Sequence, residues 1–369
     1  MSLRFFLCGD VMTGRGIDQA LPHPVDPVLY EPYVHDAREY FELAEKAHGA
    51  FQRPVSFDYI WGDALQELEQ SQIDLKIVNL ETAITSKETP WPDKGIHYRM
   101  HPLNIGCLSA ARISACALAN NHVLDWGYDG LSETLRSLDT VGIGHSGAGN
   151  NAEEAAAPAA LNVKGKPRVL LFSFGSTTSG ISREWSATSS RAGVNLLNDL
   201  SDATATKVAA QMRRRQQSGD LLIASIHWGS NWSYDIPSKQ IAFAHRLIEE
   251  GVAIVHAHSS HHVKAIEVFK GRLILYGCGD FLTDYEGISG YEEFRADLAL
   301  MYFVELDSQT GQLLSARLVP MQMRRFRLEH TSAANAHWLC DLLKNLGARF
   351  RTQARLAKDN SMMLEWREE

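Results

Sequence analysis

Histidines gather in one short segment that follows an apolar, strand-like run. The run covers residues 252–255, and His256, His258, His261 and His262 come after it. Imidazole nitrogens bind Mn, Fe and Zn, and two of them on a short loop can converge on one ion. We predict that His258 and His261 are metal ligands. His256 would be a buried or supporting residue, and His262 would be exposed.

Four other polar clusters also come after apolar runs of strand length. In chain order they contribute Asp10, Glu81, Asn121 with His122, and His227. Because ligands of open α/β sheets bind at the carboxyl ends of the strands, we expect these side chains to converge. Carboxylates, an amide oxygen and imidazoles without cysteine favour one or two Mn, Fe or Zn ions in a hydrolytic centre over a structural zinc site.

Three residues beside these ligands are candidates for catalysis. His122 can protonate a leaving group, and Asp125 lies three residues further along the chain. Arg15 can clamp a phosphate or carboxylate of a substrate. Each cluster also has a structural interpretation, since the asparagines before His122 can cap a helix and a single His or Glu at a strand end is often structural.

Apolar runs alternate with segments of helical period, which indicates a largely parallel sheet covered by helices. The expected strands cover residues 3–8, 75–78, 115–119, 169–174, 221–226, 253–255 and 272–276. The expected helices cover residues 59–70, 131–141, 202–217 and 238–250. Residues 298–318 are typical of a hairpin that turns at residues 307–311.

Two regions stand outside this alternation. Residues 21–54 are rich in proline and aromatic residues and form an insertion after the first strand. They would lie over the carboxyl ends of the strands, or equally form a structural loop or a contact in a homo-oligomer. Residues 333–366 have the pattern of one or two helices. We therefore predict a main domain over residues 1–330 and a packed helical extension over residues 331–369.

The composition excludes several classes of protein. A hydrophobic fraction of 45% and a charged fraction of 22% are ordinary for a globular protein. A net charge of −8 and a single basic triplet, residues 213–215, make nucleic acid an unexpected partner. The five scattered cysteines indicate buried thiols in a reducing compartment. With neither a signal peptide nor a transmembrane segment in the pattern, the expected location is cytoplasmic.

The order of the motifs resembles that of the CapA family, the poly-γ-glutamate capsule synthesis proteins within the calcineurin-like metallophosphatases. The matching segments are residues 9–15, 79–82, 119–122, 125–127, 147–150, 154–155, 227–229, 258–267 and 279–281. The resemblance implies an α/β fold with a four-layer α/β/β/α sandwich. It also implies that His122 is the catalytic histidine and that the metal ligands are Asp10, Glu81, Asn121, His227, His258 and His261.

The chain differs from the family pattern at a few positions. Met12 stands where phosphatases of the superfamily carry the histidine of Asp-x-His. Ser259 and Ser260 replace the histidine and proline that CapA proteins place between the two outer histidines. Asp280 stands where the family usually has asparagine. The first strand therefore offers one metal ligand fewer than the superfamily pattern.

The resemblance and the ligand set lead to one expected function and two alternatives. We expect a metal-dependent hydrolase in which metal-bound hydroxide attacks a phosphoester or a γ-glutamyl amide. One alternative is a non-catalytic accessory protein of poly-γ-glutamate biosynthesis. The other is an enzyme of small-molecule metabolism that uses the same scaffold. The expected partner is a small-molecule or γ-glutamyl substrate.

Overall fold

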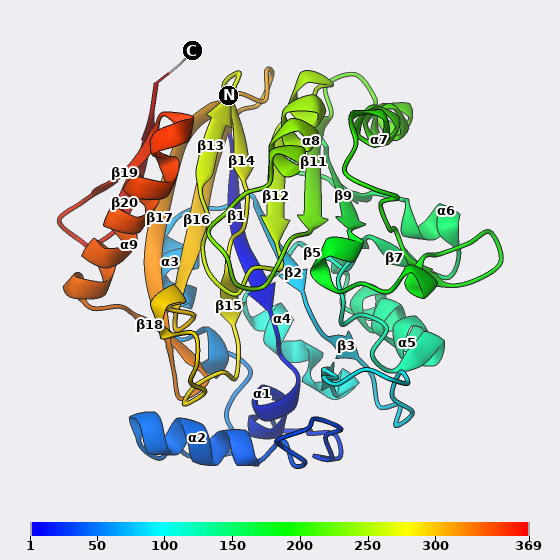
Figure 1. The fold of residues 1–369 in the computed structure, drawn as a ribbon, viewed down its shortest axis with the longest axis vertical. Helices are drawn as coiled ribbons and strands as arrows, with labels where there is room; N and C mark the ends of the chain where they lie inside the picture. The colour runs from blue at the N-terminus through cyan, green and yellow to red at the C-terminus, as the bar shows by residue number, and fades with distance from the viewer. Residues whose placement is uncertain (1, 368–369) are drawn as a thin grey trace.

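Two β-sheets packed face to face, with helices on both outer faces, make up the protein (Figure 1). The computed structural model describes residues 2–367. Three buried clusters of apolar side chains separate the layers, one between the sheets and one beneath each set of helices. The predicted α/β fold with four layers, α/β/β/α, is therefore confirmed.

The first sheet combines a parallel half and an antiparallel half. Its parallel strands are β1 (Ser2–Val11), β2 (Leu75–Leu80), β5 (Ala115–Ala117) and β6 (Gly144–Ser146). On the other side of β1 lie the antiparallel strands β16 (Leu298–Asp307), β17 (Leu313–Arg324), β20 (Met362–Trp366) and β19 (Thr352–Leu356). Two short strands, β15 (Asp280–Leu282) and β18 (Arg327–His330), pair with β1 and β17. The β16–β17 hairpin is as predicted.

The second sheet has a parallel centre and an antiparallel strand at each edge. In spatial order its strands are β13 (Ile266–Phe269), β14 (Arg272–Leu275), β12 (Ile254–His258), β11 (Leu221–His227), β9 (Val169–Gly175) and β8 (Ala159–Leu161). Two small ladders pair β3 (Ala83–Ile84) with β4 (Arg99–Met100), and β7 (Ala148–Gly149) with β10 (Gly193–Val194). The pattern of apolar runs predicts most strands of both sheets. It misses the short strands β6, β8 and β13, and it does not predict the division into two sheets.

The helices lie outside the sheets because each has one apolar face to bury. The first sheet is covered by α1 (Arg15–Ala20), α2 (Glu39–His48), α3 (Asp63–Gln70), α4 (Gly106–Ala110) and α5 (Gly127–Thr140). The second is covered by α7 (Asp202–Arg215) and α8 (Ser238–Glu249). The remaining helices are α6 (Ala152–Ala155), α9 (Ala333–Gly347) and single turns over Tyr59–Trp61, Pro102–Ile105, Thr177–Ser179, Arg183–Trp185, Glu292–Phe294 and Ala348–Phe350.

The alternation of side chains along β1 explains its unbroken apolar sequence. Phe5 and Leu7 lie in the core between the sheets, whereas Phe6 and Cys8 lie beneath the helices. Since successive side chains of a strand point to opposite faces, a strand covered on both faces must be apolar throughout. The polar Asp10 then marks the point where the strand leaves the core.

The C-terminal prediction is partly wrong. Helix α9 forms as expected, but residues 352–366 form the β19–β20 hairpin rather than a second helix. The reason is visible in burial: Thr352 and Ala354 are buried while Gln353 and Arg355 are exposed, which is the two-residue period of a strand. Because β20 pairs with β17, these residues complete the main sheet instead of forming a separate extension. Residues 368 and 369 lie outside the described part.

The insertion, residues 21–54, comes directly after α1. It carries α2, which Figure 1 shows beside α1 at the end to which β1 points. No helix within residues 2–367 has both the length and the apolarity needed to cross a bilayer.

Candidate metal centre

The carboxyl ends of four strands deliver the candidate ligands to one place. Asp10 lies at the end of β1, and Glu81 comes directly after β2. His227 and His258 are the last residues of β11 and β12, and the parallel register of these two strands sets them side by side. The second sheet thus faces the first with two imidazoles opposite two carboxylates.

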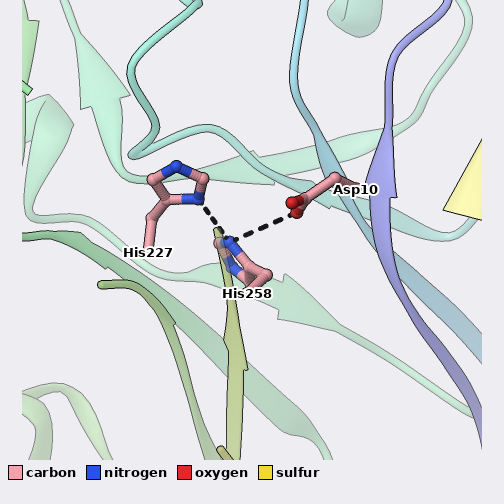
Figure 2. A group of neighbouring side chains, drawn as sticks. All are labelled: Asp10, His227 and His258. Carbon is pink, nitrogen blue, oxygen red and sulfur yellow. Dashed lines mark hydrogen bonds and ion pairs between the residues drawn. The ribbon is translucent and has the colours of Figure 1, made fainter. Parts of the chain in front are cut away.

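Three of these groups meet at one point, as Figure 2 shows. A ligand atom of each of Asp10, His227 and His258 lies within 4.8 Å of those of the other two, and all three residues are buried. The Nδ1 atoms of the two imidazoles are 2.8 Å apart, and Nδ1 of His258 is 3.8 Å from Oδ1 of Asp10. This convergence confirms that the strand ends bring the predicted side chains together.

A chain of hydrogen bonds fixes where the protons of His258 reside. The carbonyl oxygen of Cys8 only accepts, so the Nε2 atom of His256, 2.7 Å away, carries a proton. In a neutral ring Nδ1 of His256 must then accept, and its donor is the hydroxyl of Ser225 at 3.1 Å. That hydroxyl oxygen accepts in turn from Nε2–H of His258 at 2.9 Å. Nδ1 of His258 is therefore left with a bare lone pair.

The Nδ1 atom of His227 is also unprotonated, because of a different hydrogen bond. Its Nε2 atom lies 2.8 Å from the amide oxygen of Asn121, which only accepts, so Nε2 carries the proton and Nδ1 is bare. Burial lowers the pKa of His227 and of His258 well below the usual value, which keeps both rings neutral. Two lone pairs and a carboxylate oxygen thus face one another, an arrangement that a cation stabilises and that repels itself without one.

Buried carboxylates add to the need for positive charge. The amide nitrogen of Asn79 bonds Oδ1 of Asp10 at 2.7 Å and Oε2 of Glu81 at 3.0 Å. Burial, followed by repulsion from Asp280, raises the pKa of Asp10 to about 7. Burial and the charges of Asp10 and Asp280 also raise the pKa of Glu81. A divalent cation would allow these groups to ionise together.

The donor set fits such a cation. Carboxylate oxygens with neutral imidazoles suit Mn, Fe or Zn, and each ligating histidine has its second nitrogen fixed by an oxygen, as metal-bound histidines usually do. Glu81 lies on the opposite side of His227, with Oε1 3.8 Å from Nε2. Its predicted role as a metal ligand stays a prediction.

His261 lies at the edge of this group and is held by Asp280. Nδ1 of His261 is 2.9 Å from a carboxylate oxygen of Asp280. Burial lowers the pKa of His261, but the charge of Asp280 outweighs this effect and the pKa is raised. The rings of Trp232 and Tyr285 pack against the imidazole. His261 therefore flanks the three-residue cluster rather than joining it.

Asn121 contacts the imidazole of His227. Its amide oxygen holds His227, so the contact that is present orients an imidazole. Asn120, its neighbour, is buried and bonds the backbone of Leu80 and the side chain of Asn79. The predicted role of Asn121 as a direct ligand stays a prediction.

His122 and Asp125 form a pair on the other side of Glu81. Nδ1 of His122 donates to Oδ2 of Asp125 at 2.7 Å, and Lys94 bonds the second oxygen of Asp125 at 2.5 Å. Burial and the charge of Lys94 lower the pKa of His122 to about 4, so the ring is neutral and its bare Nε2 faces Glu81 at 3.9 Å. Asp125 therefore orients His122, and the predicted catalytic roles of both residues stay predictions.

The prediction for Arg15 is wrong. Its guanidinium is buried, binds both oxygens of Asp284 and also bonds Glu31 at 2.8 Å. The rings of Tyr40 and Tyr98 cover it at 4.2 and 4.3 Å from their centroids. With two carboxylates bound and no exposed face, Arg15 joins the insertion to the loop after β15 and is not available to clamp a substrate.

Sequence reasoning missed several residues of the site. Ser225 lies inside an apolar strand, and Lys94 comes from an irregular segment, so neither has a local signal. His262 is buried against Trp232 and Phe294 rather than exposed. The prediction that His256 is a buried, supporting residue is confirmed.

The geometry can be compared with known proteins. A model of the family described as bacterial capsule synthesis protein PGA_cap matches residues 4–285. The chain belongs to this family. The match covers Asp10 through Asp284, and so includes all the strand ends that build the metal centre. The resemblance to the capsule synthesis family is thereby confirmed, and the metallophosphatase superfamily stays a prediction.

Named relatives of the PGA_cap family agree with this assignment. A probable polyglutamine synthesis accessory protein of Mycobacterium tuberculosis is 43% identical over 355 residues, which cover 96% of this chain and 93% of the relative. The PGA biosynthesis protein CapA of Bacillus subtilis is 23% identical over 310 residues, 82% of this chain and 68% of that protein. The capsule biosynthesis protein CapA of Bacillus anthracis is 26% identical over 192 residues, 52% and 45% of the two chains.

A solved structure from Thermus thermophilus covers 85% of this chain and 97% of its own, with 9% identity and a TM-score of 0.37. That likeness is too weak to support an inference.

Proposed function

We propose that this protein is a metal-dependent hydrolase that cleaves γ-glutamyl amide bonds in the metabolism of poly-γ-glutamate. The observation that carries the proposal is the pair of bare Nδ1 atoms, on His227 and His258, directed at one point beside Asp10. A neutral, buried and preoriented donor set of this kind is suited to hold a divalent cation. The resemblance to the poly-γ-glutamate capsule synthesis proteins suggests the polymer, and relatives named for polyglutamine, capsule and PGA synthesis support it.

The first element of the mechanism is the hold on the cation. Asp10, His227 and His258 would bind it, with Glu81 next to it. When bound, a divalent cation supplies Lewis acidity toward a carbonyl or phosphoryl oxygen and lowers the pKa of water. The rigid β11 and β12 strands fix both imidazoles in advance, so binding requires little reorganisation of the protein.

His122 would move the proton. Its Nδ1–H bond to Asp125 leaves Nε2 able to accept, and Nε2 faces the carboxylate of Glu81. Nε2 first takes the proton released when water attacks the carbonyl carbon, and then returns it to the departing amide nitrogen. The C–N bond breaks as the amine leaves, and a γ-carboxylate remains. Lys94 keeps Asp125 ionised, which keeps His122 in the required tautomer.

A second candidate is a non-catalytic accessory protein that binds metal without turnover. Met12, where the superfamily pattern has a histidine, favours it because the first strand then offers one ligand instead of two. The Mycobacterium tuberculosis relatives are also named as probable accessory proteins of polyglutamine synthesis. Phosphoester hydrolysis would use the same metal-binding residues, so the experiment below also includes a phosphodiester substrate.

The test uses chain stripped of metal and reloaded with Mn, Fe or Zn, incubated with poly-γ-glutamate, γ-glutamyl amides and a phosphodiester. We expect release of new amino groups from the amide substrates by the reloaded wild type, and none by His258→Ala. Metal binding without turnover on any substrate would favour the accessory protein. Turnover that survives His258→Ala would contradict the proposed site.

A further inference from the structure

A groove lies at the C-terminal end of the chain, away from the metal centre. It is open to solvent and has a volume of about 960 Å³. It runs between the end of α9 and the β19–β20 hairpin and is lined by Lys344, Ala348, Arg351, Thr352, Gln353, Glu365, Trp366 and Arg367. Nothing in the mechanism above uses it.

The groove is positively charged on a negatively charged protein. Residues 344–367 contain six basic and two acidic side chains, whereas the whole chain has a net charge of −8. Lys344, Arg351 and Arg367 are exposed, and within residues 2–367 none of them forms an ion pair. Glu365, the carboxylate in the lining, is already bound by Gln353 and Arg355. Within residues 2–367 the groove therefore presents three exposed cations that form no ion pair.

The lining of the groove also includes an apolar side chain. Trp366 is half-buried and adds an apolar side chain to the lining. An occupant that fits this lining carries regularly spaced negative charges on a chain with methylene groups. Arginine and lysine bind carboxylates through charge-assisted hydrogen bonds, and an indole packs well against methylenes.

Strand register places the groove far from the metal centre. Met363 lies opposite Arg317, Arg317 opposite Phe303, and Phe303 opposite Phe6 of β1. From Met363, β20 runs on to Trp366 toward the start of β1, whereas Asp10 lies toward its end. Figure 1 shows the C-terminus and α1 at opposite ends of the molecule. An occupant of the groove thus leaves the metal centre open.

We propose that this groove binds an extended polycarboxylate chain of γ-glutamyl residues. The inference rests on the proposed function for the identity of the polymer, and on the groove for its binding. A long chain held there keeps its other segments at high local concentration near the metal centre. The groove is then a retention site that acts independently of hydrolysis.

The experiment measures fluorescence anisotropy of a labelled γ-glutamyl oligomer with the full chain. The variant carries Lys344→Gln, Arg351→Gln and Arg367→Gln. The control carries Lys164→Gln, Lys207→Gln and Arg214→Gln, which remove the same charge from exposed positions elsewhere. Each exposed ion pair contributes little on its own, so the variant removes three cations together. We expect the groove variant to lose about tenfold or more in affinity for the oligomer and the control less than about threefold. Wild-type binding should also weaken with added salt.

Four results would overturn the inference. One is an equal loss in both triple variants, and another is full binding of an oligomer whose α-carboxylates are amidated. The third is tighter binding of a single-stranded oligonucleotide, which would assign the groove to nucleic acid. Binding that requires removal of Glu368 and Glu369 would make the chain's own end the occupant and would also contradict it.

The two proposals fail separately. His258→Ala should keep wild-type affinity for the oligomer, because His258 lies outside the groove. If wild type hydrolyses the polymer but the groove variant binds and retains it as well as wild type, only the groove proposal fails. If no metal or turnover is found but the groove variant loses binding, only the hydrolase proposal fails.

Discussion

The Nδ1 atoms of His227 and His258 lie 2.8 Å apart, and the hydrogen bonds of both rings leave neither atom protonated. The contact is imposed by the fold, because the two residues are paired in register at the ends of adjacent strands. Two acceptors at this distance repel unless something positive lies between or beside them. The carboxylate of Asp10 completes a donor set to which a divalent ion adds the missing charge.

Ser225→Ala should weaken metal binding. The hydroxyl fixes the tautomer of His258 by linking it to His256, and its loss frees the imidazole to rotate or to protonate Nδ1. Removing a partner that orients a ligand typically lowers metal affinity by about 10–100-fold. Competitive chelator titration measures this directly. The matched control is Ser173→Ala, a buried strand serine that contacts no ligand; an equal loss of affinity there would refute the orienting role.

His122→Ala should reduce turnover without removing the metal. A general acid–base residue contributes about 10²–10⁴-fold to rate, so kcat on a γ-glutamyl amide should fall by that factor. Metal content should stay at the wild-type level, since His122 is not part of the three-residue cluster. His337→Ala, an exposed histidine, is the control. Unchanged kcat in His122→Ala would remove this residue from the mechanism.

Arg15→Ala should destabilise the protein. It leaves Asp284 and Glu31 buried without their counter-charge, and breaking a buried ion pair in this way costs about 3–5 kcal/mol. The free energy of unfolding in urea is the measurement. Arg246→Ala, which removes a more exposed pair with Asp202, should cost about 1 kcal/mol or less. Normal stability with a raised KM for anionic substrates would instead restore Arg15 as a substrate clamp.

Lys264→Met should stabilise the protein at neutral pH. Lys264 is only 3% exposed, and burial lowers its pKa from 10.5 to about 8, with Asp235 the nearby opposing charge. A depressed folded-state pKa means that the charged amine destabilises the fold below pH 8 and that this penalty disappears as the pH rises to 10.5. The gain should be at most about 3 kcal/mol at about pH 7. Urea unfolding at neutral pH and at a pH near the unfolded-state pKa checks it: a gain independent of pH would contradict the burial of a charged amine.

Most of the fold could be predicted from the sequence. Strands covered on both faces are continuous apolar runs, and β1, β9, β11 and β12 all have that pattern. The division into two sheets could not be predicted from local pattern, because it depends on which strands pair. The β19–β20 hairpin was mistaken for helix because its two short alternating runs are interrupted by a turn at residues 357–361.

The site could be predicted less completely. Asp10, His227 and His258 follow apolar runs, so the position of each along its strand identifies it. Arg15 could not be placed, because its partner Asp284 is 269 residues away in the chain. The same holds for Ser225 and Lys94, whose roles come from contacts with distant segments. Long-range hydrogen bonds leave no period or motif in the local sequence.

The most direct test of the metal centre is anomalous diffraction from crystals grown with Mn²⁺, collected on both sides of the metal absorption edge. The account predicts a peak at ligand distance from Nδ1 of His227, Nδ1 of His258 and a carboxylate oxygen of Asp10. It also predicts that the peak is absent in His258→Ala crystals grown in the same way. No peak at these atoms in the wild type, or coordination through the Nε2 atoms, would contradict it.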